Sequence, residues 1–306
     1  MSSIMTNVAA MTALKTLQQT NKALETTQSR ISTGYKVNDA ADNAAYWSIA
    51  TTMRSDNKAL GTVQDALGLG SAKVDVAYTG MNAAIKVVDE IKTKLVAARE
   101  PGVDRSKVQE EITQLQNQLV SITTAAAFSG ENWLSVDSGD AAYSATKSIV
   151  ASFNRSSAGT VSVSTVDIDI SSTELFDAAD QSGILDTTFT TTGAGAATVS
   201  VSDLDITAAG IDNTDIDDMI SNVDGALASM STAAATLGAA KSRVSIQKDF
   251  VGELMNAIDR GISTLVDADM TAESTRLQAL QTQQQLGIQA LSIANSGAQS
   301  VLSLFR

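Results

Sequence analysis

Residues 60–98 read LGTVQDALGLGSAKVDVAYTGMNAAIKVVDEIKTKLVAA. Twelve positions of this stretch follow the alternating three- and four-residue spacing of a helix that packs along one seam, and eleven of them are apolar. The seam positions are Leu60, Val63, Leu67, Gly70, Val74, Ala77, Met81, Ala84, Val88, Ile91, Leu95 and Ala98. The spacing predicts a long helix with one buried face, and Gly70 is interpreted as a point where another helix comes close.

A second helix follows after a short turn. Pro101 and Gly102 end the first helix, and Asp104 is placed to cap the next one. The same spacing then continues over six apolar seam residues, which are Val108, Ile112, Leu115, Leu119, Ile122 and Ala126. The pattern predicts an antiparallel helical hairpin over 57–127, whose first arm would be about 58 Å long at 1.5 Å per residue.

The C-terminal part carries two seams in different phase. From residue 220, twelve of fourteen seam positions are apolar, namely all except the two lysines of Ile220, Val223, Leu227, Met230, Ala234, Leu237, Lys241, Val244, Lys248, Val251, Met255, Ile258, Ile262 and Leu265. A new frame then covers Leu277, Leu280, Gln284, Gly287, Leu291, Ala294, Ala298, Val301 and Phe305, of which seven are apolar. The change of phase predicts a break between two helices near 267–269.

The N-terminal part mirrors this arrangement. Leu17, Leu24 and Ile31 are seven residues apart, with Leu14 beside them, and the loop-like segment 31–45 separates them from the long helix. Each end of the chain therefore has a terminal helix, a break and a long helix. We expect the two ends to lie side by side, with the centre of the sequence as an insertion.

That centre, 135–217, has a different composition. It holds two basic residues, Lys147 and Arg155, against thirteen acidic ones, which accounts for −11 of the net charge of −13. TVSVSTVDIDI at 160–170 recurs as TVSVSDLDI at 198–206, and the alternation predicts two strands, each with a phase slip that indicates a bulge. We interpret the centre as a small β-rich acidic domain; the alternative is a low-complexity filler.

Composition excludes many kinds of chemistry. The chain has no His and no Cys, which removes imidazole acid–base schemes, most nucleophilic triads and zinc–thiolate sites, so we expect no enzyme, no cofactor and no metal. The pI near 4.4 argues against a nucleic-acid partner. Asp212, Asp215, Asp217 and Asp218 lack the Gly and Glu of a calcium loop, and are interpreted as a solvated acidic face with carboxylates at a helix N-terminus. The N-terminus does not have the pattern of a cleaved secretory signal.

The segment 277–305, LQALQTQQQLGIQALSIANSGAQSVLSLF, contains no Asp, Glu, Lys or Arg. Its seven Gln residues make a membrane a poor partner. Its apolar seam suits another helix, and its remaining uncharged faces suit further copies of the chain. The alternative is an ordinary helical hairpin inside a monomer.

Three stretches resemble one family. SRISTGYKVNDAADNAAYWSIATTMRSD (29–56) and DADMTAESTRLQALQTQQQLGIQALSIANSGAQSVLSLFR (267–306) resemble the N- and C-terminal signatures of bacterial flagellins, and FSGENWL (128–134) is similar to the turn that leaves their helical rod. The resemblance covers about 1–135 and 218–306, and the Tyr46-Trp47 variant resembles alphaproteobacterial flagellins.

The resemblance implies a mainly α fold with a long antiparallel helical rod, coiled-coil termini and a small β-rich inserted outer domain. It implies an N-terminal inner coiled-coil helix at 1–35, a rod from 36–134 and 218–266, a variable outer domain at 135–217 and a C-terminal inner helix at 267–306. Such a protein would be exported unfolded through the flagellar type III channel, and would polymerise into the extracellular filament used for swimming. Its partners would be other flagellin subunits, the filament cap, the hook–filament junction proteins and an export chaperone at the C-terminal helix, with no nucleic acid and no membrane.

The resemblance also implies roles for particular residues. An inner-layer polymerisation role carries over to Leu14, Leu17, Leu24, Ile31, Leu280, Leu291, Asn295, Val301, Leu302, Leu304 and Phe305. Packing between rods carries over to Asn43, Ile49, Met53 and Arg54. For both sets, the alternative is a place in the core of a single chain.

Three other functions compete with the filament subunit. A hook–filament junction protein resembles flagellin at both ends but caps the filament instead of extending it. A secreted coiled-coil adhesin would use the acidic centre to bind a ligand or calcium. A flagellin with a protease insert would need metal-ligating His, which the chain lacks.

Overall fold

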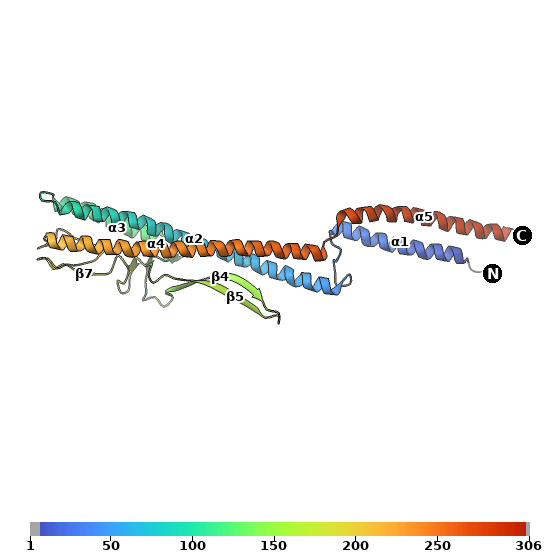
Figure 1. Ribbon diagram of the computed structural model, residues 1–306, viewed down its shortest axis with the longest axis horizontal. Coiled ribbons are helices and arrows are strands. Elements are labelled where there is room, and N and C mark those ends of the chain that lie inside the picture. The colour runs from blue at the N-terminus through green and yellow to red at the C-terminus, as the bar shows by residue number, and fades with distance from the viewer. Residues whose placement is uncertain (1–6, 304–306) are drawn as a thin grey trace. The chain divides into compact units, whose positions relative to one another are not determined.

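The structure is a computed structural model that describes the backbone of residues 7–303 and the side chains of residues 7–297. The chain forms two compact units, one made of 1–58 and 255–306 and the other of 59–254. The described residues contain five α-helices (Figure 1), which are α1 (Val8–Thr33), α2 (Ala44–Ala98), α3 (Arg105–Ala125), α4 (Asn213–Val266) and α5 (Met270–Ser303).

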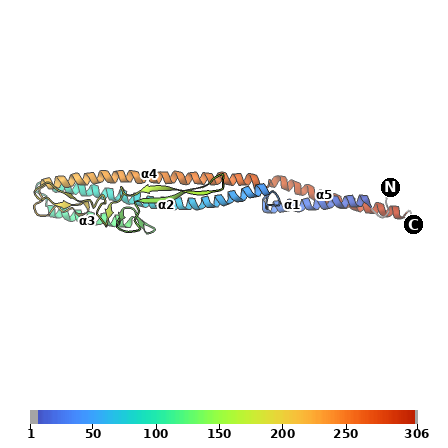
Figure 2. The same ribbon diagram turned by 90° about the horizontal axis from the view of Figure 1, so that it is seen from below.

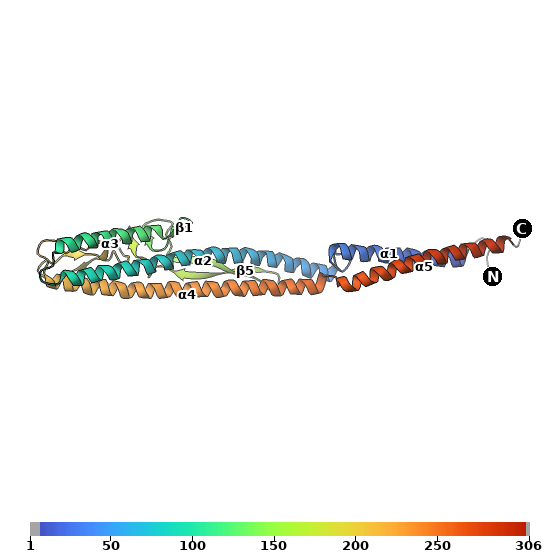
Figure 3. The same ribbon diagram turned by 90° about the horizontal axis from the view of Figure 1, so that it is seen from above.

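In the first unit, α1 and α5 lie side by side in antiparallel order (Figure 3). Side-chain contacts fix their register at three levels. The Asn7 amide donates to the Ala294 carbonyl at 3.0 Å, and the Gln284 amide donates to Asn21 Oδ1 at 2.8 Å. At the other end, Arg30 Nη1 lies 3.1 Å from Glu273 Oε1. Asn7 also caps α1 by accepting from the Ala10 N–H, and Gly34 ends that helix at a φ of 77°.

A small core lies where the terminal helices meet the longer ones. Val37, Ala50, Ile262 and Val266 are buried together, and Met53, Ile258 and Leu265 pack against them. The predicted break is confirmed, because α4 ends at Val266 and α5 begins at Met270. The predicted loop at 31–45 is also confirmed in outline, since the structure leaves 34–43 outside the helices.

The second unit is built on the predicted seam. All twelve seam positions of 60–98 are buried. The α3 and α4 seams are buried in part, because Val108, Leu115 and Ile122 are half-buried and Lys241 and Lys248 are exposed. Ion pairs align α2 with α4: Lys241 Nζ lies 2.6 Å from Asp75, and Arg99 Nε lies 2.5 Å from Asp217. The number of residues between Asp75 and Arg99 on α2 equals the number between their partners Asp217 and Lys241 on α4. The partners occur in the opposite order along α4, so the two helices keep one antiparallel register between these ion pairs.

The long helix begins earlier than the sequence predicted. The hairpin was expected from residue 57, but α2 begins at Ala44. The reason is Asn43, whose Oδ1 accepts from the Tyr46 N–H at 3.1 Å and whose carbonyl accepts from the Trp47 N–H. These first turns carry exposed apolar side chains, so an apolar-seam search misses them.

The strands of the described residues form four separate two-stranded sheets. The strands are β1 (Ala127–Phe128), β2 (Glu131–Asn132), β3 (Ser135–Val136), β4 (Thr146–Arg155), β5 (Val161–Asp169), β6 (Phe176–Asp177), β7 (Phe189–Thr190) and β8 (Thr198–Val199). The strands β1 and β2 flank a two-residue turn in which Ser129 and Gly130 have φ values of 54° and 82°, the sign that a type I′ hairpin requires.

The antiparallel ribbon of β4 and β5 runs along the α2 and α4 pair (Figure 2). Ile149 of β4 lies over Gly70, where an added Cβ would come within 2.5 Å of the Ile149 side chain. The Gln247 amide of α4 donates to the Ala151 carbonyl at 3.0 Å. The interpretation of Gly70 as a close helix contact is therefore wrong, because the element that needs the missing side chain is a strand.

The two predicted central strands have different outcomes. The strand at 160–170 is confirmed as β5, but its bulge lies on the partner, where the register shifts between Val150 and Ser152 of β4. The strand at 198–206 is wrong beyond Val199, because 201–203 form a short 3-10 helix. Glutamines of α3 satisfy this backbone: Gln109 accepts from the Ile206 N–H at 2.9 Å and donates to the Leu204 carbonyl at 2.9 Å. Beyond Val199, the alternation of apolar and polar residues reflects the burial of alternate side chains next to α3, and not pairing in a sheet.

The observed fold confirms the predicted class, mainly helical with a small β-rich insertion. Within the part of the chain that the structure describes, no helix is both long and apolar enough to cross a membrane.

Candidate assembly surface

The face of α1 that touches α5 is narrow and made mostly of small or polar side chains. Thr20 and Thr27 are the buried residues of α1, and Leu17, Leu24 and Ile31 are half-buried. Leu17 packs over Gly287, where an added Cβ would come within 3.2 Å of Leu17 Cδ1. The two helices therefore approach each other closely at Gly287.

Large apolar side chains lie on the outside of this pair. Leu286, Ile288 and Ile293 of α5 are 58%, 55% and 71% exposed. Val8, Met11 and Leu14 of α1 are exposed as well. A lone exposed Leu or Ile is ordinary, but six on two paired helices without neighbouring charge on α5 make an apolar surface that a partner could cover.

A hollow of about 640 Å³ opens between the two helices near the end where α1 begins. Its lining consists of small or short side chains on both helices, among them Ala9, Ala13, Gly287, Ala290 and Ala294. Such a surface lets another helix approach closely, because no long side chain stands in the way. Val8 lines this hollow, whereas Leu286 and Ile288 lie on opposite flanks of α5, two residues apart and so about 160° apart around the helix.

The structure brings together many of the residues expected in the inner layer. Leu17, Leu24, Ile31 and Leu291 are half-buried and Leu280 is buried, on the facing sides of α1 and α5. Leu14 and Asn295 are exposed. Val301 and Leu302 belong to α5, but their side chains lie outside the described residues, as do Leu304 and Phe305 altogether.

The four residues expected to pack between rods have different surroundings. Asn43 caps α2, and Met53 packs against the small core of the first unit. Arg54 stacks over the Tyr35 ring, with Cζ 5.1 Å from the centroid. Ile49 is 49% exposed. Of these four residues, Ile49 is the exposed one, and the other three are half-buried within the chain.

Sequence reasoning did not assign a role to Leu286, Ile288 and Ile293, or to the exposed aromatic rings of Tyr46 and Trp47. A usable signal was present. The three aliphatic residues fall off the seam that starts at Leu277, within a segment that carries no charge, so they could not all face α1. An apolar residue outside the seam of a paired helix is a candidate for contact with another molecule.

The acidic residues before α4 organise the backbone around them. Asp212 accepts from the Thr214 and Asp215 N–H groups and caps the helix, as the interpretation of carboxylates at a helix N-terminus predicted. The interpretation as a solvated face is wrong for Asp215, whose side chain is buried by the backbone it binds. Asp215 is buried, and its Oδ2 accepts from the N–H groups of Gly195 and Asp212 at 3.0 Å. The Thr191 hydroxyl and these N–H groups lower the pKa of Asp215 to about 2. Among the described residues, no group of His, Cys, Asp and Glu is arranged to hold a metal ion.

A second set of buried carboxylates lies further into the insertion. Burial raises the pKa of Glu174, which accepts from the Tyr143 hydroxyl at 2.6 Å, and that hydrogen bond raises the pKa of Tyr143 to about 12. Burial alone would raise the pKa of Asp177, but N–H groups of Ser138 and Ala179 and nearby hydroxyls hold it below its usual range. These hydrogen bonds join segments of the insertion that are distant in sequence, so they help to hold its fold.

The sequence was compared with models of protein families and with known proteins. Residues 4–138 match the model for the bacterial flagellin N-terminal helical region, and residues 220–305 match the model for the bacterial flagellin C-terminal helical region. The chain belongs to the bacterial flagellin family. The segment 139–219, between the two matches, holds most of the acidic insertion.

Curated flagellins match over their whole length. The chain is 53% identical to Flagellin C of Rhizobium meliloti (strain 1021) and 47% identical to the flagellin of Brucella melitensis biotype 1, with 100% of both chains covered in each case. It is 46% identical to Flagellin A of the same Rhizobium strain, again over all of both chains. These organisms are alphaproteobacteria, as the Tyr46-Trp47 variant predicted.

Proposed function

We propose that the chain is a structural subunit that polymerises into the extracellular filament of a bacterial flagellum. The observation that carries the proposal is the set of exposed aliphatic side chains Leu286, Ile288 and Ile293 on 277–297 of α5, a stretch without charged residues, in a chain that belongs to the flagellin family. A pair of helices that exposes Leu286, Ile288 and Ile293 gains by covering those side chains with copies of itself.

In this proposal the five segments expected from the sequence become layers of the filament. The helices of 1–35 and 267–306 form the inner layer, 36–134 and 218–266 form the rod layer, and 135–217 faces outward. The acidic insertion would keep neighbouring filaments apart through its charge. The eleven inner-layer residues and four rod residues named from the family resemblance are then subunit contacts, with Met53 and Leu280 also contributing inside one chain.

Assembly in a cell would need further partners. We infer export of the unfolded chain through the flagellar type III channel, a chaperone at the C-terminal helix, and contact with the cap and hook–filament junction proteins. The family is a structural one, and catalysis is not expected. Nothing in the fold favours the junction protein or the adhesin over the filament subunit.

The proposal is tested by seeded polymerisation, observed by negative-stain electron microscopy. Filament seeds are extended with the full chain or with a chain that ends at Arg276, which lacks most of α5. We expect long tubes from the full chain only. A full chain that stays monomeric on intact seeds, while a flagellin of known activity extends the same seeds, would contradict the proposal.

A further inference from the structure

The hollow between α1 and α5 opens on one side of this helix pair. Leu17 of α1 packs over Gly287 of α5, so these two residues mark the line along which the helices face each other. At about 100° per residue, Ala9 and Ala13 lie about 80° and 40° away from this line around α1, and Ala290 lies about 60° away in the same sense around α5. In antiparallel helices the same sense of rotation leads to the same side of the pair. The three alanines, all of which line the hollow, therefore lie on one side, which we call the hollow side.

Three large apolar side chains lie on the opposite side, which we call the ridge side. Met11 and Leu14 of α1 lie about 120° and 60° from the facing line in the other sense, and Ile288 of α5 lies about 100° from it. They are 56%, 45% and 55% exposed. The hydrogen bond from Gln284 to Asn21 supports this assignment, because these two residues lie about 60° and 40° from the line in the same sense as the ridge.

Two further aliphatic side chains stand beside the hollow. Leu286 and Ile293 of α5 lie about 100° and 120° from the facing line, in the same sense as Ala290. They are 58% and 71% exposed. Apart from Val8, which lines the hollow, the exposed large apolar side chains of 7–16 and 286–297 thus fall into two groups, a ridge on one side and a wall next to the hollow on the other.

Apolar side chains can cover the hollow without leaving its hydroxyl groups unpaired. The two hydroxyls, on Thr12 and Thr16, donate within α1 to the Val8 and Thr12 carbonyls at 2.9 and 3.0 Å. The other lining residues are Val, Ala and Gly. The same two stretches of the helices contain one charged residue, Lys15, which lies about 160° from the facing line and so on the side of α1 away from α5. Covering the hollow therefore requires no charge to lose its water.

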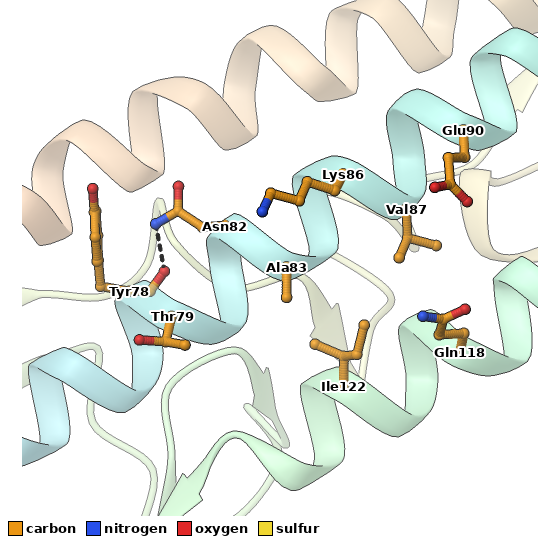
Figure 4. Close-up of a pocket in the computed structure, with 9 residues that line it drawn as sticks. All are labelled: Tyr78, Thr79, Asn82, Ala83, Lys86, Val87, Glu90, Gln118 and Ile122. Atoms are coloured by element: carbon orange, nitrogen blue, oxygen red, sulfur yellow. Dashed lines mark hydrogen bonds between the residues drawn. The ribbon is translucent and has the colours of Figure 1, made fainter.

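A second hollow suits an apolar ridge less well. It has a volume of about 490 Å³ and opens between α2 and α3, where Figure 4 shows Lys86 and Glu90 projecting from α2 and Gln118 from α3. Most of its lining residues carry polar side chains, so an aliphatic side chain placed there would displace water from polar groups without replacing their hydrogen bonds. The hollow between α1 and α5 has no such cost.

We propose that the ridge of one copy, formed by Met11 and Leu14, packs into the α1/α5 hollow of another copy. The inference rests on the proposed function and names the two surfaces of one contact between subunits. The occupant is a second copy because flagellins assemble with other flagellin subunits. A row of large side chains on one helix packs closely when it enters a groove of small ones. In this contact Met11 and Leu14 lie against the alanines of the hollow and next to the wall of Leu286 and Ile293.

The positions of the two surfaces favour a head-to-tail contact over a two-fold one. A two-fold contact between two hollows would cover Leu286 and Ile293 of both copies but would leave both ridges in water. A contact of ridge with hollow covers apolar side chains on both sides of every copy. It leaves a free ridge at one end and a free hollow at the other, so it continues into an open assembly, as a filament requires.

Disulfide cross-linking tests the contact, and the chain suits it because it contains no Cys. Met11→Cys and Ala290→Cys are combined in one chain, assembled on seeds and oxidised. Within one chain these two positions lie on opposite sides of the pair, and a disulfide needs Cα atoms within about 7 Å, so a link must join two chains. The matched control combines Met11→Cys with Gln289→Cys, the neighbouring exposed position, which lies about 160° from the facing line.

We expect dimers, trimers and longer species from the first pair and none from the control, on denaturing gels without reductant. Ala290→Cys alone should give no link, because two hollows do not face each other in this contact. Filaments that grow without a ladder, or with equal ladders from both pairs, would overturn the contact, and dimers from Ala290→Cys alone would overturn it in favour of the two-fold one. Each of these results leaves the proposed function standing, whereas a wild-type chain that does not extend seeds removes both.

A size-swap series decides the case in which the Cys variants do not assemble. Ala290→Met fills the hollow from an exposed position, so it should leave the thermal unfolding of the monomer unchanged but lower the rate of seeded elongation several-fold. Adding Met11→Ala, which shortens the ridge, should restore most of that rate. Gln289→Met, on the side of α5 away from α1, should have little effect. No recovery in the double variant, with every variant folded by circular dichroism, would refute the contact.

Discussion

The α1/α5 pair and the helical core of the second unit use the same apolar repeat but bury it to different extents. Along α2, all twelve seam positions of 60–98 are covered by α3, α4 and the β4–β5 ribbon. Along the described part of α5 the seam faces α1, and its residues are half-buried except Leu280, which is buried. The comparison shows that the burial of a seam depends on the number of elements packed around it, and within the described residues the terminal pair has no third element.

The largest effect should come from a charge placed in the terminal seam. Leu291→Asp would put an unpaired carboxylate into a helix contact, at a cost of several kcal/mol. We expect no filament growth on seeds, while the thermal unfolding of the α2–α4 core stays close to that of the wild type. The volume-conserving Leu291→Met should assemble normally. Normal filaments from Leu291→Asp would show that this seam does not need to be buried.

The next prediction sets one leucine of each region against the other. Leu67 is fully buried, so Leu67→Ala should lower the free energy of unfolding of the monomer by about 2–5 kcal/mol. Leu286 is largely exposed, so Leu286→Ala should change it by at most about 0.5 kcal/mol, yet slow filament growth because the side chain is covered only in the assembly. Urea unfolding of the monomer and seeded growth measure the two effects. Equal loss of stability in both variants would contradict the comparison.

A smaller effect is expected from the ion pair that fixes the α1/α5 register. Glu273 is buried and Arg30 is partly covered, so Arg30→Ala leaves a carboxylate without its partner and should cost about 1–3 kcal/mol locally. The matched control is Lys107→Ala, which removes the exposed Lys107–Asp104 pair and should cost less than about 0.5 kcal/mol. Hydrogen exchange of α1 amides measures the first effect, and that of α3 amides the second. Unchanged protection of α1 in Arg30→Ala would show that the register does not depend on this pair.

The spacing of apolar residues predicted the parts of the fold in which one helix packs along another helix. The seam from Leu60, the turn at Pro101 and the break before Met270 follow from local spacing and capping, which the sequence displays directly. It also predicted most of the facing residues of α1 and α5, with the exception of Leu14, which is exposed. The off-seam positions of Leu286, Ile288 and Ile293 could also be read from the spacing. What the spacing could not show is how completely a seam is covered, since that depends on how many elements surround the helix.

The insertion was predicted less well because its contacts are distant in sequence. The repeat at 198–206 has the alternation of a strand, but two glutamines of α3 bind its backbone. Gly70 sits in a helical seam, but the side chain above it comes from β4. In both places the residue that determines the local structure belongs to another element. The spacing of residues within the segment itself does not identify that residue.

The smallest effect should appear in acid, at the start of α4. Hydrogen bonds in the folded chain lower the pKa of Asp215 to about 2, from an ordinary value of 3.8. A carboxylate with a lowered folded pKa stabilises the fold above its ordinary pKa, and this contribution is lost as the pH falls from about 4 to about 2. We therefore expect hydrogen exchange at the Gly195 and Asp212 amides, which donate to Asp215, to rise over that window before the α2 seam opens. Asp215→Asn should remove the pH dependence, and Asp203→Asn, at an exposed carboxylate, should keep it. If both amides stay protected to pH 2 while the α2 seam exchanges, the helical core and not the insertion would be the acid-sensitive region of the second unit.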